Sequence, residues 1–146
     1  EELLSDVSGI KVNKAPSEKF DSNYWLCTIT IDESVKVKGQ EKAYVVAITS
    51  AVGGAAGVIH AGGGVHTDCE PNANVEAMRM ALDAAGIEAR PVWKPMHKQP
   101  VYKNAPVYVN GVSESIFKVG MCLPAGPYVT DDDVRYIVGQ IKANIL

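Results

Sequence analysis

The chain has 146 residues, a size that suits one domain with its own hydrophobic core. Hydrophobic residues make up 47% of it and charged residues 21%, which is ordinary for a globular protein. Its net charge of -3 disfavours a nucleic-acid-binding protein. No apolar run approaches the roughly 20 residues that a membrane span needs, so we expect no membrane partner.

The three cysteines, Cys27, Cys69 and Cys122, are widely spaced and odd in number. This pattern fits reduced thiols in a cytoplasmic protein better than a disulfide framework.

The first third of the chain predicts two strands. Residues 1–6 could end a helix, and residues 7–12 are a short strand candidate interrupted by Gly9. Residues 24–31 give the clearest strand, because alternate positions from Trp25 to Ile31 are apolar and the threonines lie between them. One face of this strand is therefore expected to be buried.

Residues 43–64 predict a hairpin with a glycine-rich return. Residues 43–52 are apolar and β-branched, and six glycines lie between positions 53 and 64. Known phosphate-binding glycine loops lead directly into a helix or carry a Gly-Lys-Ser/Thr signature, and neither context is present. We therefore favour a mobile loop or an oligomer-contact arm over a phosphate site.

A zinc site is the alternative interpretation for the end of this region. His60, His66 and Cys69 have plausible ligand spacing. A structural site needs four protein ligands, and only Asp68 or Glu70 is near enough to complete the set. We favour a structural role for these residues and predict no metal.

Residues 74–85 predict a helix, followed by a strand at 87–92. Val75, Met78 and Leu82 make an apolar stripe, Asn72 or Asn74 can cap the start, and a glycine follows the end. After a loop at 102–110, residues 111–119 predict a short helix with Val112, Ile116 and Val119 inward, and residues 121–123 a brief buried strand.

The C-terminal helix has the strongest signals. Thr130 and Asp133 form a capping-box pattern, and an apolar stripe runs from Val134 to Ile145. Capping explains the aspartates at 131–133 better than metal binding does. Together these elements predict an α+β fold for residues 1–146 as a single domain: a two-layer sandwich with a mostly antiparallel sheet and helices on one face.

Residues 90–100 carry the most varied chemistry. Three prolines argue against a helix or a central strand and predict a rigid, extended edge. The segment presents a planar cation, an aromatic ring, an ammonium, an imidazole and a carboxamide, from Arg90, Trp93, Lys94, His97 and Gln99. Such a set suits a polar, anionic, partly ring-shaped ligand. It equally suits an edge strand protected by Pro and Lys, with the Trp capping the core.

Three runs in the second half resemble one enzyme family. Residues 86–100 (GIEARPVWKPMHKQP), 120–126 (GMCLPAG) and 130–134 (TDDDV) are similar to the C-terminal part of the DegT/StrS sugar aminotransferases. These are pyridoxal-phosphate enzymes that aminate keto sugars, commonly nucleotide-linked. The resemblance implies that residues 1–146 are an excised C-terminal small domain. Residues 33–71 depart from the family pattern, which predicts a glycine-rich insertion.

The resemblance also implies roles for individual residues. In that family a lysine of the large domain holds the cofactor as a Schiff base, and no lysine here matches its context, so we expect this chain alone to be inactive. His97 corresponds to the histidine that faces the sugar, and Trp93, Lys94 and Gln99 would line the same mouth. Tyr102 would join them.

Arg90 has two interpretations: pairing with a substrate carboxylate or phosphate, and pairing with an acid of its own domain. The partners that the resemblance implies are the keto sugar, an amino donor such as glutamate, the protein's own large domain, and a second copy in a homodimer.

Two other functions remain open. A stand-alone binding or regulatory module with the same fold would explain the missing lysine context and the insertion. A structural interaction domain would use the glycine-rich residues 53–64 as a docking element.

Overall fold

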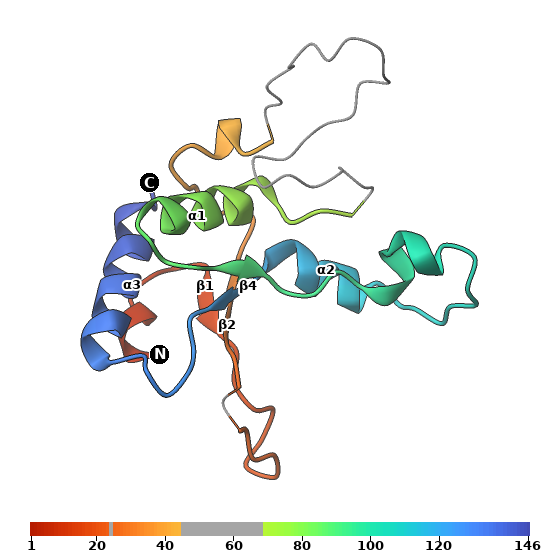
Figure 1. The fold of residues 1–146 in the computed structure, drawn as a ribbon, viewed down its shortest axis with the longest axis horizontal. Helices are drawn as coiled ribbons and strands as arrows, with labels where there is room; N and C mark the ends of the chain where they lie inside the picture. The colour runs from red at the N-terminus through yellow and green to blue at the C-terminus, as the bar shows by residue number, and fades with distance from the viewer. Residues whose placement is uncertain (24, 45–68) are drawn as a thin grey trace.

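The computed structural model describes residues 1–23, 25–44 and 69–146. In this part of the chain, an antiparallel sheet has the strand order β1-β2-β4-β3 (Figure 1). The strands are β1 (Ile10–Val12), β2 (Cys27–Ile31), β3 (Arg90–Pro91) and β4 (Gly120–Leu123). The predicted strands at 7–12, 24–31, 87–92 and 121–123 are therefore all present, and the first three are shorter than expected.

The register of the sheet separates a buried face from a polar one. Ile31 lies opposite Ile10, and Ile29 lies opposite Met121. Opposed residues share a face, and these four are 6% exposed or less. The alternation predicted for β2 is confirmed within the strand. It fails at Trp25, which is 69% exposed because it precedes the paired residues.

Two helices cover the apolar face of the sheet. α1 (Ala73–Ala84) buries Val75, Met78 and Leu82 completely, as its stripe predicted. α3 (Asp131–Ala143) buries Ile137 and Ile141, and it contacts α1. Figure 1 shows the two helices side by side on one side of the sheet. The predicted α+β architecture is thus confirmed.

The helix ends follow the sequence only in part. The capping box of α3 is present, since the Thr130 hydroxyl accepts from the Asp133 N–H and the Asp133 carboxylate accepts from the Thr130 N–H. Asn72 occupies the N-cap position of α1 without a side-chain cap bond. Asn74 instead uses its amide to donate to the carbonyls of Asp32 and Val35 at 2.8 and 3.0 Å, which ties α1 to the chain after β2.

The expectation for residues 90–100 is wrong in one respect. Residues 90–100 were expected to exclude helix, yet Met96–Lys98 (η3) and Pro100–Tyr102 (η4) form 3₁₀ turns. A single turn needs few backbone donors, so Pro95 can precede one and Pro100 can begin the other. Near the N-terminus, Glu2–Leu4 (η1) is also a 3₁₀ turn where residues 1–6 could have ended a helix.

The inward face predicted for the short helix is also wrong. α2 (Val112–Val119) begins one residue later than predicted, and its Val112 and Ile116 are 52% and 47% exposed. The buried residue is Phe117, at 4%. α2 projects beyond the edge of the α1/α3 layer (Figure 1), and its contact with the body is made to β2 on the side of Phe117 and not through its most apolar stripe.

The described part of residues 33–71 packs closely on the body. Val35 and Val37 are buried, and Val37 forms a β-bridge with Ile145 after α3. Gln40–Lys42 (η2) is a 3₁₀ turn. Most of the predicted hairpin and all of the glycine-rich return lie outside the described residues, as do His60 and His66.

Two further observations concern only the described residues. They contain no helix long and apolar enough to span a membrane, and no group of three side chains placed to hold a metal ion. No disulfide joins the three cysteines, as predicted.

Candidate functional site

The segment between β3 and α2 leaves the sheet at Val92 and extends away from the body (Figure 1). The Val92 N–H donates to the Gly120 carbonyl at 3.1 Å, which continues the sheet pairing one residue past β3. Beyond it, the two 3₁₀ turns bend the chain so that it returns toward α2. The predicted site residues lie along this excursion.

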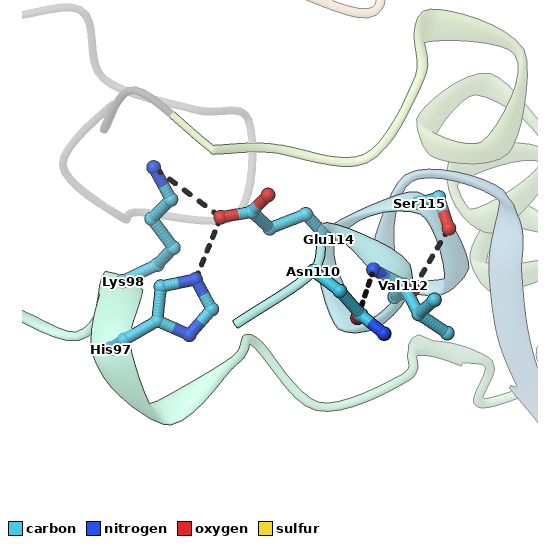
Figure 2. Close-up of polar contacts among 6 residues, drawn as sticks. All are labelled: His97, Lys98, Asn110, Val112, Glu114 and Ser115. Carbon is cyan, nitrogen blue, oxygen red and sulfur yellow. Dashed lines mark hydrogen bonds and ion pairs between the residues drawn. The ribbon is translucent and has the colours of Figure 1, made fainter. Parts of the chain in front are cut away.

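His97 and Lys98 meet one carboxylate from α2. His97 Nε2 lies 2.6 Å from Glu114 Oε1, and Lys98 Nζ lies 3.6 Å from the same oxygen (Figure 2). The side chains of His97 and Glu114 are 14% and 28% exposed. The hydrogen bond with His97, joined by the charge of Lys98, lowers the pKa of Glu114 below its usual value.

The start of α2 directs Glu114 at this segment. Gly111 adopts φ 83° at the N-cap, a left-handed conformation that glycine accepts without strain. The Asn110 carboxamide oxygen accepts from the Val112 N–H at 3.2 Å, and the Ser115 hydroxyl donates to the Val112 carbonyl at 2.8 Å (Figure 2). These contacts fix the first turn, which carries Glu114 toward η3.

Lys94 belongs to a second, adjoining cluster. Its Nζ lies 3.0 Å from Glu70 Oε1 and 5.7 Å from the centre of the Phe117 ring. Gln99 Nε2 donates to the Lys94 carbonyl at 3.2 Å. Gln99 thus links η3 to Lys94, and Lys94 lies close to α2 through Phe117.

Trp93 and Tyr102 occupy the outer part of the segment. Trp93 is 64% exposed and packs against Trp25, with ring centroids 5.8 Å apart. Tyr102 is 39% exposed at the end of η4. The two rings therefore offer apolar surface at the rim and are not part of the core.

Arg90 pairs within its own domain. Its Nε and one terminal nitrogen both donate to Glu88 Oε1, at 2.8 and 2.6 Å, and both side chains are largely exposed. Of the two interpretations that its sequence left open, the structure therefore displays the intramolecular pair. An exposed pair of this kind is weak and can exchange for another anion.

An open groove of about 520 Å³ lies beside α1 and β3, and Arg90 lines it. The other predicted site residues do not line it. Within it, Glu76 is 6% exposed and takes two hydrogen bonds from Arg79, at 2.9 and 2.7 Å. The Tyr44 hydroxyl donates to the Pro71 carbonyl at 2.5 Å, and burial, with the nearby Glu76 carboxylate, raises the pKa of Tyr44.

The structure therefore divides the predicted residues into three places. His97 and Lys94 lie against α2, with Gln99 bonded to the Lys94 carbonyl. Trp93 and Tyr102 lie exposed in the outer part of the segment, and Arg90 lines the groove. Glu114 was not predicted, and Glu70 was considered only as a possible zinc ligand and not as the partner of Lys94. One feature of the sequence indicated that acids would lie here. Residues 90–100 contain several basic side chains and no acidic one, so any acidic partners had to come from other parts of the chain.

A covalent link to a carbonyl cofactor uses a lysine amine as the nucleophile. Lys94 and Lys98 are each engaged by a carboxylate, Glu70 at 3.0 Å and Glu114 at 3.6 Å, so the geometry does not hold either amine ready for such a link.

Comparison with known proteins decides the family. The sequence model of the DegT/DnrJ/EryC1/StrS aminotransferase family matches residues 63–142, more than half of the chain. The chain belongs to this family. The resemblance noted for residues 86–134 is thereby confirmed, and it extends over α1 and α3.

A curated relative and two solved structures support the assignment. The putative pyridoxal phosphate-dependent aminotransferase EpsN of Bacillus subtilis (strain 168) is 47% identical over 61 residues, which cover 39% of this chain and 16% of EpsN. The aminotransferase TlmJ from Streptoalloteichus hindustanus aligns with a TM-score of 0.59 and 17% identity, over 97% of this chain and 28% of TlmJ.

The second solved structure agrees. A DegT DnrJ EryC1 StrS aminotransferase from Brucella abortus aligns with a TM-score of 0.58 and 21% identity, over 97% of this chain and 27% of that one. At these identities the two structures establish a shared fold. The chain thus spans about a quarter of the length of these aminotransferases and less of EpsN, as expected of the family's C-terminal small domain.

Proposed function

We propose that this chain is the small domain of a pyridoxal-phosphate-dependent aminotransferase that acts on a keto sugar, commonly nucleotide-linked, with glutamate as an amino donor. The family match over residues 63–142 carries the proposal, and the name of EpsN supports the cofactor. The cofactor would supply the amino-group transfer itself, held by the large domain of the same polypeptide. The chain in isolation is then inactive.

The role of the small domain is to bind and orient the sugar. His97 and Lys94 are held at fixed positions by Glu114 and Glu70, and the Gln99 carboxamide donates to the Lys94 carbonyl. Imidazole, ammonium and carboxamide groups recognise hydroxyl and phosphate oxygens. The rings of Trp93 and Tyr102, both exposed, provide apolar surface against a sugar or nucleobase ring.

Arg90 would bind a phosphate or carboxylate of the substrate by exchanging its exposed partner Glu88. Pairing with Glu88 alone is the other outcome, and substitution of Arg90 distinguishes the two. Arg90→Ala should raise the KM for a nucleotide-linked sugar and leave the KM for a free sugar unchanged, if Arg90 binds the phosphate.

The function is tested on the intact polypeptide that contains this chain. With glutamate and a nucleotide-linked keto sugar, mass spectrometry should detect an amino sugar, whereas a simple 2-keto acid should not serve as the main acceptor. His97→Ala should lower sugar turnover and leave the cofactor absorbance unchanged. Unchanged sugar turnover in that variant would remove the role given to His97.

Sites of this kind are completed across a dimer of the whole enzyme, which is our proposal for the quaternary state. Sedimentation of the intact polypeptide should give a homodimer. A monomer with full activity would contradict it.

A further inference from the structure

The contact between His97 and Glu114 has a consequence for substrate binding, which rests on the proposed function. We propose that Glu114 is a positioning residue: it fixes the His97 imidazole with Nε2 toward α2, so that Nδ1 is presented to a hydroxyl group of the sugar. The proposal concerns one ring orientation and one tautomer. Both can be measured without a functioning enzyme.

The first support is the geometry of the pair. The separation of 2.6 Å between His97 Nε2 and Glu114 Oε1 is that of a short hydrogen bond. The two side chains are 14% and 28% exposed, so solvent screens the contact less than it screens a surface ion pair. A carboxylate accepts only, and the proton between the two atoms therefore belongs to Nε2.

The second support is that Glu114 stands on a rigid element. The left-handed Gly111 and the hydrogen bond from the Val112 N–H to Asn110 fix the start of α2. His97 itself lies on η3, a single 3₁₀ turn outside the sheet. A side chain on a single turn outside the sheet gains a defined orientation when it is bonded to a helix, and outer partners of functional imidazoles act in this way.

The third support is the charge around the carboxylate. Lys98 Nζ lies 3.6 Å from the same oxygen, above the contact that His97 makes with it (Figure 2). The carboxylate thus holds two successive residues of η3. Within the described residues, His97 Nδ1 has no hydrogen-bond partner, and it lies across the ring from Glu114 (Figure 2).

The chemistry follows from the tautomer. A neutral imidazole with its proton on Nε2 has a lone pair on Nδ1, which accepts a hydrogen bond. The hydroxyl groups of a sugar are the donors that match it. Glu114 thereby sets His97 as an acceptor for the substrate, a role that a freely rotating imidazole would fill only part of the time.

The test uses two variants of equal side-chain length. Glu114→Gln keeps an oxygen acceptor for the Nε2 proton, and Glu114→Met removes it. The tautomer of His97 is read from ¹⁵N chemical shifts of the 146-residue chain labelled at histidine, at a pH where the ring is neutral, with His97→Ala assigning the signal. Asp132→Ala, which removes an exposed ion pair with Arg135 on α3, is the control.

The expected result is one tautomer, protonated at Nε2, in the native chain, the Gln variant and the control, and a mixture in the Met variant. In the intact enzyme the Met variant should lose about 10–100-fold in kcat/KM for the sugar, and the Gln variant less, with the reaction of the amino donor unchanged. An unchanged tautomer in the Met variant would overturn the inference. A failure of the proposed function looks different, because the intact polypeptide would then form no amino sugar, whatever the tautomer of His97.

Discussion

Trp25 and Trp93 lie with their ring centroids 5.8 Å apart and their planes at 34°, although 68 residues separate them in the chain. Both rings are more than 60% exposed. Trp25 lies two residues before β2 and Trp93 lies two residues after β3, so the contact joins the chain just outside these two strands. This contact between two aromatic rings lies where the candidate-site segment leaves β3.

The strength of this contact can be measured with a double-mutant cycle. Trp25→Ala and Trp93→Ala should each destabilise the chain slightly, and the double variant should cost less than their sum by about 0.5–1.5 kcal/mol. Urea unfolding followed by far-UV circular dichroism gives the free energies. Additive losses would show that the rings do not interact in solution.

Asn74 is expected to matter more for stability than its neighbour at the N-cap. Asn74→Ala removes the amide that bonds the carbonyls of Asp32 and Val35, and should lower the free energy of unfolding by about 1–3 kcal/mol. Asn72→Ala, at a cap position without a side-chain cap bond, should change it by less than about 0.5 kcal/mol. Equal losses in the two variants would contradict the assignment.

These residues show what sequence could and could not predict. The helices, strands and buried stripes followed from periodicity, because Val75, Met78 and Leu82 repeat at helical spacing whatever they pack against. The partners did not follow. Whether Asn74 capped a helix or bonded a distant loop depended on how β2 is placed, and residue spacing carries no such information.

The sequence predicted which segment carries the candidate site, but not how its side chains are paired with the rest of the chain. His97, Lys94 and Gln99 were recognised from one segment, but Glu114 and Glu70 come from 17 residues after His97 and 24 residues before Lys94. The inward face predicted for α2 was wrong for the same reason, since Phe117 is the buried residue of this helix and the spacing of apolar residues did not indicate which side would meet the rest of the chain.

Gly120 should not tolerate a larger residue. A Cβ there would lie 2.7 Å from Val92 Cγ2 and 2.8 Å from the Ile116 carbonyl oxygen. Gly120→Ala should therefore destabilise the chain by about 1–3 kcal/mol. The matched control is Gly139→Ala in α3, where a Cβ meets nothing within 4 Å. The higher helix propensity of alanine should raise the free energy of unfolding of this variant by about 1 kcal/mol. Thermal unfolding that moves in the same direction for both variants would contradict this.

The capping box of α3 should make stability depend on pH. Hydrogen bonds from the Thr130 hydroxyl and N–H lower the pKa of Asp133 below its usual 3.8. A lowered folded-state pKa contributes stability that is complete above pH 3.8 and is lost as pH falls through the depressed value.

The pH prediction is measured by difference, because other carboxylates also have lowered pKa values, such as Asp6 beside Lys142. Urea unfolding between pH 7 and pH 2 should show a smaller acid-side loss in Asp133→Asn than in the native chain. Parallel curves for the two proteins would mean that the capping box is not formed in solution.

The visible absorption spectrum of the intact polypeptide, recorded before and after borohydride reduction, tests the central claim most directly. Membership of the aminotransferase family over residues 63–142 predicts a yellow protein whose band disappears on reduction, with pyridoxal phosphate left covalently attached outside this chain. A colourless protein that takes up no added pyridoxal phosphate would contradict the account and leave a binding module with the same fold.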